Sequence, residues 1–297
     1  MLKLKILGLS VCALSTGIAF SGTMGPISDS TRSVYVGLGG GFNSISVNNK
    51  LYAFGISNTF QLGAPTYSGA AEGYSNQLPN VQTTFSPQVQ VGFQNYFPGR
   101  KEYWGLKGTY QFLNAHAVAY NTPIAQYGAY INLGTGGLAS SAFAGNVLPE
   151  SAQVTTNHQI NLLALMGHSF SSSDLYMGAG PTLLGMQSKI FNAFPFANID
   201  GVTTSQSDLP VSYSRTMWVV GGAGQLGMTY HFSPTWFLDF NYTYGATPYK
   251  TVKNPLKSIG KRQVPTGGSS TGVLVVNSSQ SVAVQTFAIT VNKMFGL

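Results

Sequence analysis

The sequence predicts an all-β fold, an eight-stranded antiparallel up-and-down transmembrane β-barrel with four long extracellular loops. Three features predict it: a shortage of charge, strands that alternate apolar and polar residues, and short turns that alternate with long connections. Only 8% of the 297 residues are charged, against about 25% in a soluble globular protein, while aromatic residues reach 12%. So few charges cannot cover a soluble surface. After the leader, no run of about 18 uninterrupted apolar residues follows, which argues against helical membrane spans.

The N-terminus is typical of an exported chain. Two lysines precede an apolar core, and the small residues Ala19 and Ser21 place a cleavage site before Gly22. Residues 1–21 are therefore expected to be a signal peptide and residues 22–297 the barrel. Cleavage removes Lys3, Lys5 and the single cysteine, and leaves 13 Lys and Arg against 8 Asp and Glu, a net charge of about +5.

Period-two alternation marks the strands. The stretch GQLGMTYHFSPTWFLDFNYTYG, residues 224–245, has two alternating runs around the turn SPT and predicts a β-hairpin with one apolar face. The same pattern predicts eight strands, at 33–45, 85–97, 103–116, 158–170, 174–190, 213–232, 236–249 and 282–297. The fourth and fifth are the least regular, because INLLALMG has apolar residues at both odd and even positions and also fits a short helix.

The connections alternate in length. Three are tight, at 98–102, 171–174 and 233–235, and four are long and rich in Gly, Ser, Asn and Pro, at 46–84, 117–157, 191–212 and 250–281. All long loops then gather at one end, as in bacterial outer-membrane barrels. If KLYAFGISNTFQL in the first long loop forms a further hairpin, ten strands would give a wider lumen.

The two faces of the strands differ in polarity. The apolar face carries charges only near the strand ends, at Glu102 and Lys293. Such an apolar face is stable in contact with hydrocarbon. The opposite phase is polar and predicts the lumen side; it contains Gln88, Gln90, Gln94, Lys107, Gln111, Arg215, Gln225, Asp239 and Asn241. Aromatic residues near the strand ends predict two interfacial girdles, with Trp104, Trp236 and Tyr103 beside the turns and Tyr244, Tyr249 and Tyr213 near the long loops.

The export signal, the eight alternating strands and the terminal strand FAITVNKMFGL resemble the small outer-membrane β-barrels of Gram-negative bacteria, the OmpA-like and opacity-protein-like group. The leader running into GTMGP is similar to surface proteins of intracellular pathogens. The resemblance implies the cell outer membrane as location, outer-membrane lipids and lipopolysaccharide as neighbours, and the barrel assembly machinery as a partner. Members of the group commonly end on an aromatic residue, whereas this chain ends on Leu297.

Two functions follow from this reading. One is a structural or surface-interaction role, adhesin-like, through the long loops; the alternative is a porin-like channel for small solutes. An eight-stranded lumen is about wide enough to be filled by side chains, which favours the plugged barrel.

Enzymatic function is not expected, and neither is a cofactor, a metal or a nucleic-acid partner. His116 and His158 fall near the outer ends of adjacent strands, within possible reach of each other, but lack a nearby orienting acid in a strand. GAGQLG, residues 222–227, matches the dinucleotide fingerprint GxGxxG, yet the strand pattern continues through it where the fingerprint needs a helix.

One predicted site lies in the lumen. Lys107 and Asp239 are each about four residues from a short turn, both on the inward phase, on strands that face each other across an eight-stranded ring. We expect them to form an ion pair, because an unpaired buried charge is costly. The alternative is two separate charges solvated by lumen water.

A second predicted site is the last long loop. Between Ala246 and Ser281 it carries five positive charges and no acid: Lys250, Lys253, Lys257, Lys261 and Arg262. Such a cluster attracts polyanions, here the phosphates of lipopolysaccharide or a host surface polyanion such as a sulfated glycan. Pro248, Pro255 and Gly260 argue against one helix, so the loop is expected to be a flexible basic arm. The alternative is a merely solvated charge run.

Overall fold

The computed structural model describes residues 32–61, 64–132, 140–199, 202–205, 210–253, 257–264 and 268–296. Nearly all of this chain is β-strand. Within the described ranges there is no helix long and apolar enough to cross a lipid bilayer. The predicted signal peptide and the cleavage site lie outside the described residues.

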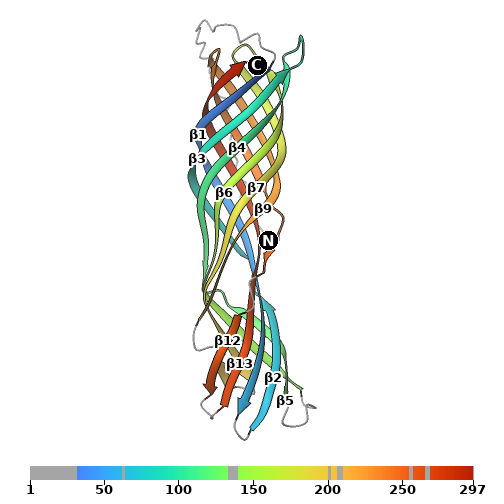
Figure 1. Cartoon of the computed structure of the whole chain (residues 1–297), viewed down its shortest axis with the longest axis vertical. Coiled ribbons are helices and arrows are strands. Elements are labelled where there is room, and N and C mark those ends of the chain that lie inside the picture. The colour runs from blue at the N-terminus through green and yellow to red at the C-terminus, as the bar shows by residue number, and fades with distance from the viewer. Residues whose placement is uncertain are drawn as a thin grey trace, which may run out of the picture.

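Eight long strands form a closed antiparallel ring (Figure 1). They are β1 (Arg32–Gln61), β3 (Leu78–Tyr96), β4 (Glu102–Tyr120), β6 (Ser140–Ser169), β7 (Ser173–Ile199), β9 (Val211–Ser233), β10 (Trp236–Ala246) and β13 (Gly268–Gly296). Each pairs with the next in chain order, and β13 pairs with β1 to close the ring. The prediction of an eight-stranded up-and-down barrel is confirmed, including the two irregular strands, which form β6 and β7.

Three tight turns join the strands at one end, which we call the turn end. They lie at residues 97–101, 170–172 and 234–235, close to the predicted positions. Gly99 in the first turn has a φ of 69°, in the left-handed region that glycine adopts without a Cβ clash. The turn end also holds the C-terminal end of β13 (Figure 1).

The long connections gather at the end opposite the turns, and strands extend into them. They contain five further strands, β2 (Ala64–Tyr74), β5 (Ile124–Asn132), β8 (Val202–Ser205), β11 (Lys250–Val252) and β12 (Lys257–Val264). Away from the turn end, β12, β13, β1, β2, β5, β6, β7 and β8 pair side by side into what we call the protruding sheet. Backbone pairing needs no particular side chain, so Gly- and Ser-rich segments that resemble loops can extend a sheet.

KLYAFGISNTFQL does not form a hairpin by itself, because residues 50–61 continue β1, and the ring is not widened. The outer half of β1 pairs with β2 over Tyr52–Gln61. At the level of the turns the ring nevertheless has eight strands, because β2 pairs with β5 only in the protruding sheet.

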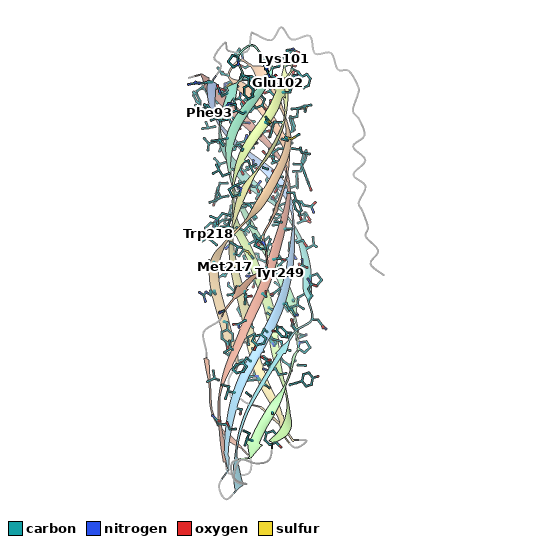
Figure 2. All side chains as sticks on the ribbon, turned by 90° about the vertical axis from the view of Figure 1, so that its right-hand side faces the viewer. Phe93, Lys101, Glu102, Met217, Trp218 and Tyr249 are labelled. Carbon is teal, nitrogen blue, oxygen red and sulfur yellow. The ribbon has the colours of Figure 1, made fainter. Side chains whose placement is uncertain are left out.

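Side chains cover the outside of the barrel along its length (Figure 2), and large exposed apolar ones form a belt between the turn end and the midpoint of the barrel. On β4 it runs from Trp104 to Phe112, and on β1 it ends at Phe42. Nine residues on β4 match the span of a tilted strand across a bilayer, about 9–11 residues. These exposed side chains include Val36, Leu38, Val89, Val91, Leu106, Leu162, Met166, Met177, Leu226, Phe287 and Val291.

The predicted girdles are confirmed for some aromatic residues and wrong for others. Trp104, Trp236 and Tyr244 face outward at the rims of the belt. Tyr103 and Tyr213 are instead buried inside the barrel, with 2% and 4% of their surface exposed. Side chains alternate along a strand, so the residue next to the outward Trp104 has to face the lumen.

The interior changes from polar to apolar where the belt ends. On paired strands β1 and β13, Asn43 lies opposite Thr286, and the next inward pair is Ile45 and Val284. Ile45 and Val284 belong to a buried cluster that we call the apolar plug: Ile45, Val47, Leu113, Ala115, Ala117, Val154, Leu184, Met186, Val219, Val282 and Val284. A second buried apolar cluster, around Leu51, Ile124 and Leu274, lies farther from the turn end.

The outward face changes in the opposite sense. Beyond Phe42, the outward positions of β1 are Ser44, Ser46, Asn48 and Lys50. The barrel thus has an apolar outside and a polar inside at the belt, and along β1 just beyond the belt a polar outside over an apolar inside. The first arrangement fits hydrocarbon and the second fits water.

Candidate functional site

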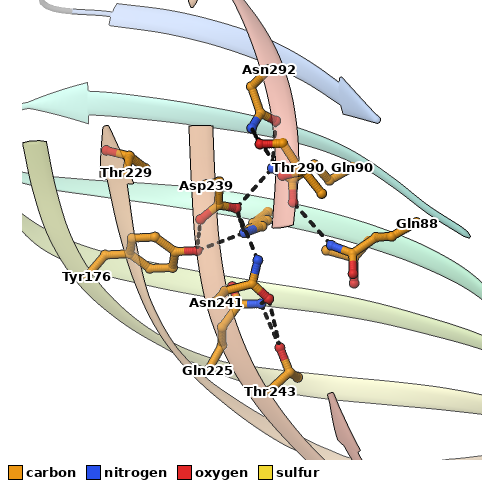
Figure 3. Close-up of polar contacts among 12 residues, drawn as sticks. Gln88, Gln90, Tyr176, Gln225, Thr229, Asp239, Asn241, Thr243, Thr290 and Asn292 are labelled. Atoms are coloured by element: carbon orange, nitrogen blue, oxygen red, sulfur yellow. Dashed lines mark hydrogen bonds and ion pairs between the residues drawn. The ribbon is translucent and has the colours of Figure 1, made fainter. Parts of the chain in front are cut away.

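Lys107 and Asp239 form an ion pair inside the belt (Figure 3). Lys107 lies on β4 and Asp239 on β10, and the Nζ to Oδ2 distance is 2.5 Å. Only 1% and 2% of their side chains are exposed. Both point into the lumen because Leu106 and Leu238, their chain neighbours, face outward. The structure therefore brings together the two lumen charges that the sequence places on opposite sides of the ring.

Further polar side chains surround the pair. Tyr176 donates its hydroxyl hydrogen to Asp239 Oδ1 at 2.6 Å, and Lys107 Nζ donates to Tyr176 Oη at 2.9 Å. Gln90 and Asn241 donate their amide hydrogens to Asp239 Oδ2, at 3.0 and 3.3 Å. The carboxylate thus accepts from four side chains, which offsets the cost of removing it from water.

The network ties distant strands together. Gln90 on β3 also donates to Asn292 Oδ1 on β13 at 2.6 Å, so β3, β4, β7, β10 and β13 are linked through one carboxylate and its partners (Figure 3). At the turn end the lumen holds Tyr35 against Phe237, with ring centroids 5.3 Å apart, and buried Met294. On the other side of the network lies the apolar plug. Side chains fill the described lumen from one end of the belt to the other.

The predicted basic cluster lies on strands and not on a flexible arm, so that expectation is wrong for the described residues. Lys250 begins β11 and pairs with Gln280 of β13, and Lys253 follows β11; both lysines are exposed. The backbone of Lys257, Lys261 and Arg262 belongs to β12, along β13. Their side chains lie outside the described part. Four of the five charged residues therefore belong to β-strands.

Arg215 joins this cluster, although its phase predicts the lumen. Its Nη1 donates to the carbonyl oxygen of Lys253 at 2.6 Å, and the side chain is exposed. The last pair between β9 and β10 is Gly222 with Ala246, so in the described chain β10 does not cover Arg215. A guanidinium that reaches water avoids the cost of burial, which explains why phase alone failed here.

His116 and His158 have separate partners. His158 lies on the outer face, where its Nδ1 is 3.0 Å from Tyr110 Oη and its ring stacks on Trp218. His116 Nδ1 is 3.0 Å from Thr155 Oγ1. In the strand pairing His116 lies opposite Thr155 and His158 opposite Phe112, so the two histidines are not strand partners.

One polar cluster was missed in the sequence. His231 Nε2 lies 3.0 Å from Asp174 Oδ2, and Ser169 donates its hydroxyl hydrogen to Asp174 Oδ1 at 2.6 Å. The carboxylate lies between the hydroxyl and the imidazole, so the imidazole is not placed to activate the serine. All three residues occupy inward positions of their strands next to a turn, and this pattern could have indicated that they lie close together. In the residues that the structure describes, no group of three or more potential metal ligands occurs.

The GxGxxG match has no nucleotide-binding geometry. Gly222 to Gly227 lie within β9, which continues to Ser233. The phosphate-binding turn needs a helix directly after the glycines, and here a strand runs on. The expectation of a strand through this motif is confirmed.

Comparisons with known proteins concern the fold alone. No family model matches the chain, and no curated protein sequence matches it. Among solved structures, the outer membrane protein OprG from Pseudomonas aeruginosa is similar, with a TM-score of 0.35 and 14% identity, over 90% of this chain and 98% of OprG. The outer membrane protease OmpT from Escherichia coli matches with a TM-score of 0.34 and 10% identity, over 89% of this chain and 97% of OmpT.

A third similar structure is Ail, the attachment invasion locus protein of Yersinia pestis. The TM-score is 0.30 and the identity 12%, over 86% of this chain and 99% of Ail.

Proposed function

We propose that this chain is an integral outer-membrane protein whose plugged barrel anchors a protruding β-sheet that makes contacts at the cell surface. The apolar belt would lie in the hydrocarbon, in contact with outer-membrane lipids. The turn end would face the periplasm and the protruding sheet the outside. β13, the terminal strand that closes the ring against β1, is the element that the barrel assembly machinery would handle.

The filled lumen is the observation that carries this proposal against a channel. The Lys107–Asp239 network occupies the belt level, and the apolar plug closes the barrel above it. A conducting eight-stranded pore would need a continuous polar path, and the plug presents Ile45, Leu184 and Val284 across that path, all almost completely buried.

Planar-bilayer conductance of the purified full-length protein tests the proposal. We expect no steady open channel at any voltage that the bilayer withstands. A steady conductance would favour the alternative, passage of small solutes, and would overturn the plugged barrel. A variant with the plug opened, Ile45→Gly with Leu184→Gly, serves as a positive control for detecting a leak.

The basic residues are proposed to contact polyanions beside the protruding sheet. Lys250 and Lys253 are exposed, and the exposed Arg215 contacts the backbone of Lys253. The strand β12 carries Lys257, Lys261 and Arg262. The first partner is the phosphate of neighbouring lipopolysaccharide, which would fix the sheet relative to the membrane. A sulfated host glycan is the adhesive alternative.

A further inference from the structure

Exposed aromatic side chains gather on the outer face of the protruding sheet, far from the apolar belt. Tyr52 of β1 lies beside Tyr74 of β2, with ring centroids 4.9 Å apart. Tyr127 of β5 lies opposite Glu72 of β2 in the strand pairing. We call Tyr52, Tyr74, Tyr127, Glu72 and Lys50 the tyrosine platform.

The platform cannot be a membrane girdle, because it lies too far from the belt. Tyr52 is ten residues beyond Phe42, the last large apolar side chain of the belt on β1. At about 3.3 Å per residue and a tilt of about 40°, this places it roughly 25 Å above the hydrocarbon. Water surrounds the protein at that height, and Tyr74 and Tyr127 still expose 61% and 73% of their surface. Exposed aromatic side chains that cluster in water mark an interaction surface.

The polar groups of the platform are already positioned. Tyr52 donates its hydroxyl hydrogen to Glu72 Oε2 at 2.5 Å, which fixes the carboxylate between the strands. Lys50 Nζ lies 4.6 Å from the centre of the Tyr74 ring. In the pairing of β2 and β5, Tyr74 and Tyr127 occupy diagonal positions, about 7–8 Å apart, on either side of Glu72.

This combination fits a carbohydrate chain. A sugar ring has an apolar C–H face that packs on an aromatic ring, and hydroxyls at its edge that donate to a carboxylate or accept from an ammonium group. Two exposed tyrosines at diagonal positions of paired strands, with the Glu72 carboxylate and the Lys50 ammonium group beside them, supply all of these contacts. A protein partner would be expected to find a closely packed apolar centre as well; Phe54, opposite Glu72, is only partly exposed, and the exposed Ile56 and Ile131 lie farther along the strands, away from Glu72.

The direction of the platform identifies the source of the carbohydrate. Its side chains point outward from the barrel wall, parallel to the membrane, and not from the tip of the sheet toward another cell. At this height the molecules beside an outer-membrane barrel are the oligosaccharide chains of lipopolysaccharide. We propose that the tyrosine platform binds the oligosaccharide of neighbouring lipopolysaccharide. This rests on the proposed outer-membrane function, and it assigns the sugar to the platform while the basic strands take the phosphate.

The test uses the full-length protein in detergent micelles. The probe is lipopolysaccharide core oligosaccharide, freed of lipid A by mild acid, then dephosphorylated and carboxyl-reduced, so that it carries no negative charge for the basic residues to bind. Titration calorimetry should show saturable binding that is insensitive to ionic strength. The double variant Tyr74→Ala, Tyr127→Ala should weaken it roughly 10-fold, at about 3-fold for each of the two aromatic contacts removed. Glu72→Gln should weaken it while leaving the rings in place.

Tyr120 provides the matched control. It is as exposed as Tyr127, at 73%. It pairs with Ser151 on β6 whereas Tyr127 pairs with Ala144, which places it roughly 23 Å away along that strand. Tyr120→Ala should therefore bind the oligosaccharide as the unchanged protein does.

Several results would overturn the inference. They are no binding of the core oligosaccharide, equal binding by the double variant, or stronger binding of a neutral mammalian glycan, lacto-N-tetraose. A photo-crosslinking amino acid at position 127 that captures a protein in intact cells, and no lipopolysaccharide, would also overturn it. Failure of the proposed function looks different: a steady channel in planar bilayers would show it, whatever the oligosaccharide titration gives.

Discussion

Lys107 Nζ and Asp239 Oδ2 lie 2.5 Å apart in the barrel lumen, although 132 residues separate them in the chain. The pair joins opposite walls of the ring, and Tyr176, Gln90 and Asn241 complete the coordination of the carboxylate. Side chains from β3, β4 and β7, three ring strands that do not pair with β10, thereby share the charge of Asp239. The stability of the barrel at the belt level should depend on this pair.

Removal of one partner of the pair should destabilise the barrel. Lys107→Met leaves Asp239 buried without its counter-charge, and a loss of about 3–5 kcal/mol in the free energy of unfolding is expected. Asp239→Asn should act similarly by leaving the ammonium group unpaired. Urea unfolding in lipid vesicles, followed by tryptophan fluorescence, measures both. Tyr176→Phe, which removes one hydroxyl and no charge, is the control with a smaller loss, and wild-type behaviour of both charge variants would show that the pair contributes nothing.

Truncation in the apolar plug should cost more than truncation on the belt. Leu184 is completely buried in the plug, and Leu184→Ala should lower the free energy of unfolding by about 2–5 kcal/mol because it leaves a cavity. Leu162→Ala is the matched control, since Leu162 is 56% exposed on the belt and lipid can fill the space. Thermal unfolding in vesicles compares the two. Equal losses would contradict the view that the plug is a packed core.

Neutralising the basic cluster should reduce polyanion binding. Changing Lys250, Lys253, Lys257, Lys261 and Arg262 together to Gln should shorten retention on lipopolysaccharide and on heparin columns, most strongly at low ionic strength, because salt screens exposed charges. Loss on lipopolysaccharide alone would identify a membrane anchor, and loss on heparin together with lost cell attachment an adhesive surface. The control is Arg100→Gln with Lys101→Gln at the turn end. Unchanged retention on both columns would show that these residues do not bind polyanions.

The hydrogen bond to Glu72 raises the pKa of Tyr52 to about 12. A folded-state pKa above the ordinary value of about 10 means that this contact stabilises the sheet fully below pH 10 and that its contribution is lost as the pH rises through about 12. Phenolate absorbance of the wild type minus that of Tyr52→Phe should therefore titrate near pH 12. In Glu72→Gln the same difference should titrate at lower pH. A midpoint near 10 in both proteins would mean that the bond does not form in solution.

The belt and the polar lumen could be predicted because each depends on one local rule. Hydrocarbon outside and polar side chains inside impose strict period-two alternation. The neighbouring residues in the sequence therefore predict that Leu106 faces outward and Lys107 faces the lumen. The ion pair could be anticipated as well, since strand order and distance from a turn place Lys107 and Asp239 at one level. Tyr103 was misplaced because its position beside a turn was given more weight than its phase next to Trp104.

The strand number, the two faces of the belt and the candidate ion pair follow from the order of amino acids, because alternation and turn spacing are local properties. The extent of the sheet beyond the membrane does not. The pairing of the segments around Leu51, Tyr127 and Leu274 depends on backbone hydrogen bonds between strands far apart in the chain. Such bonds do not require particular residue types, so composition does not predict them. Only the folded chain shows that these segments close over an apolar interior, bring Arg215 to Lys253 and hold Tyr74 and Tyr127 on either side of Glu72.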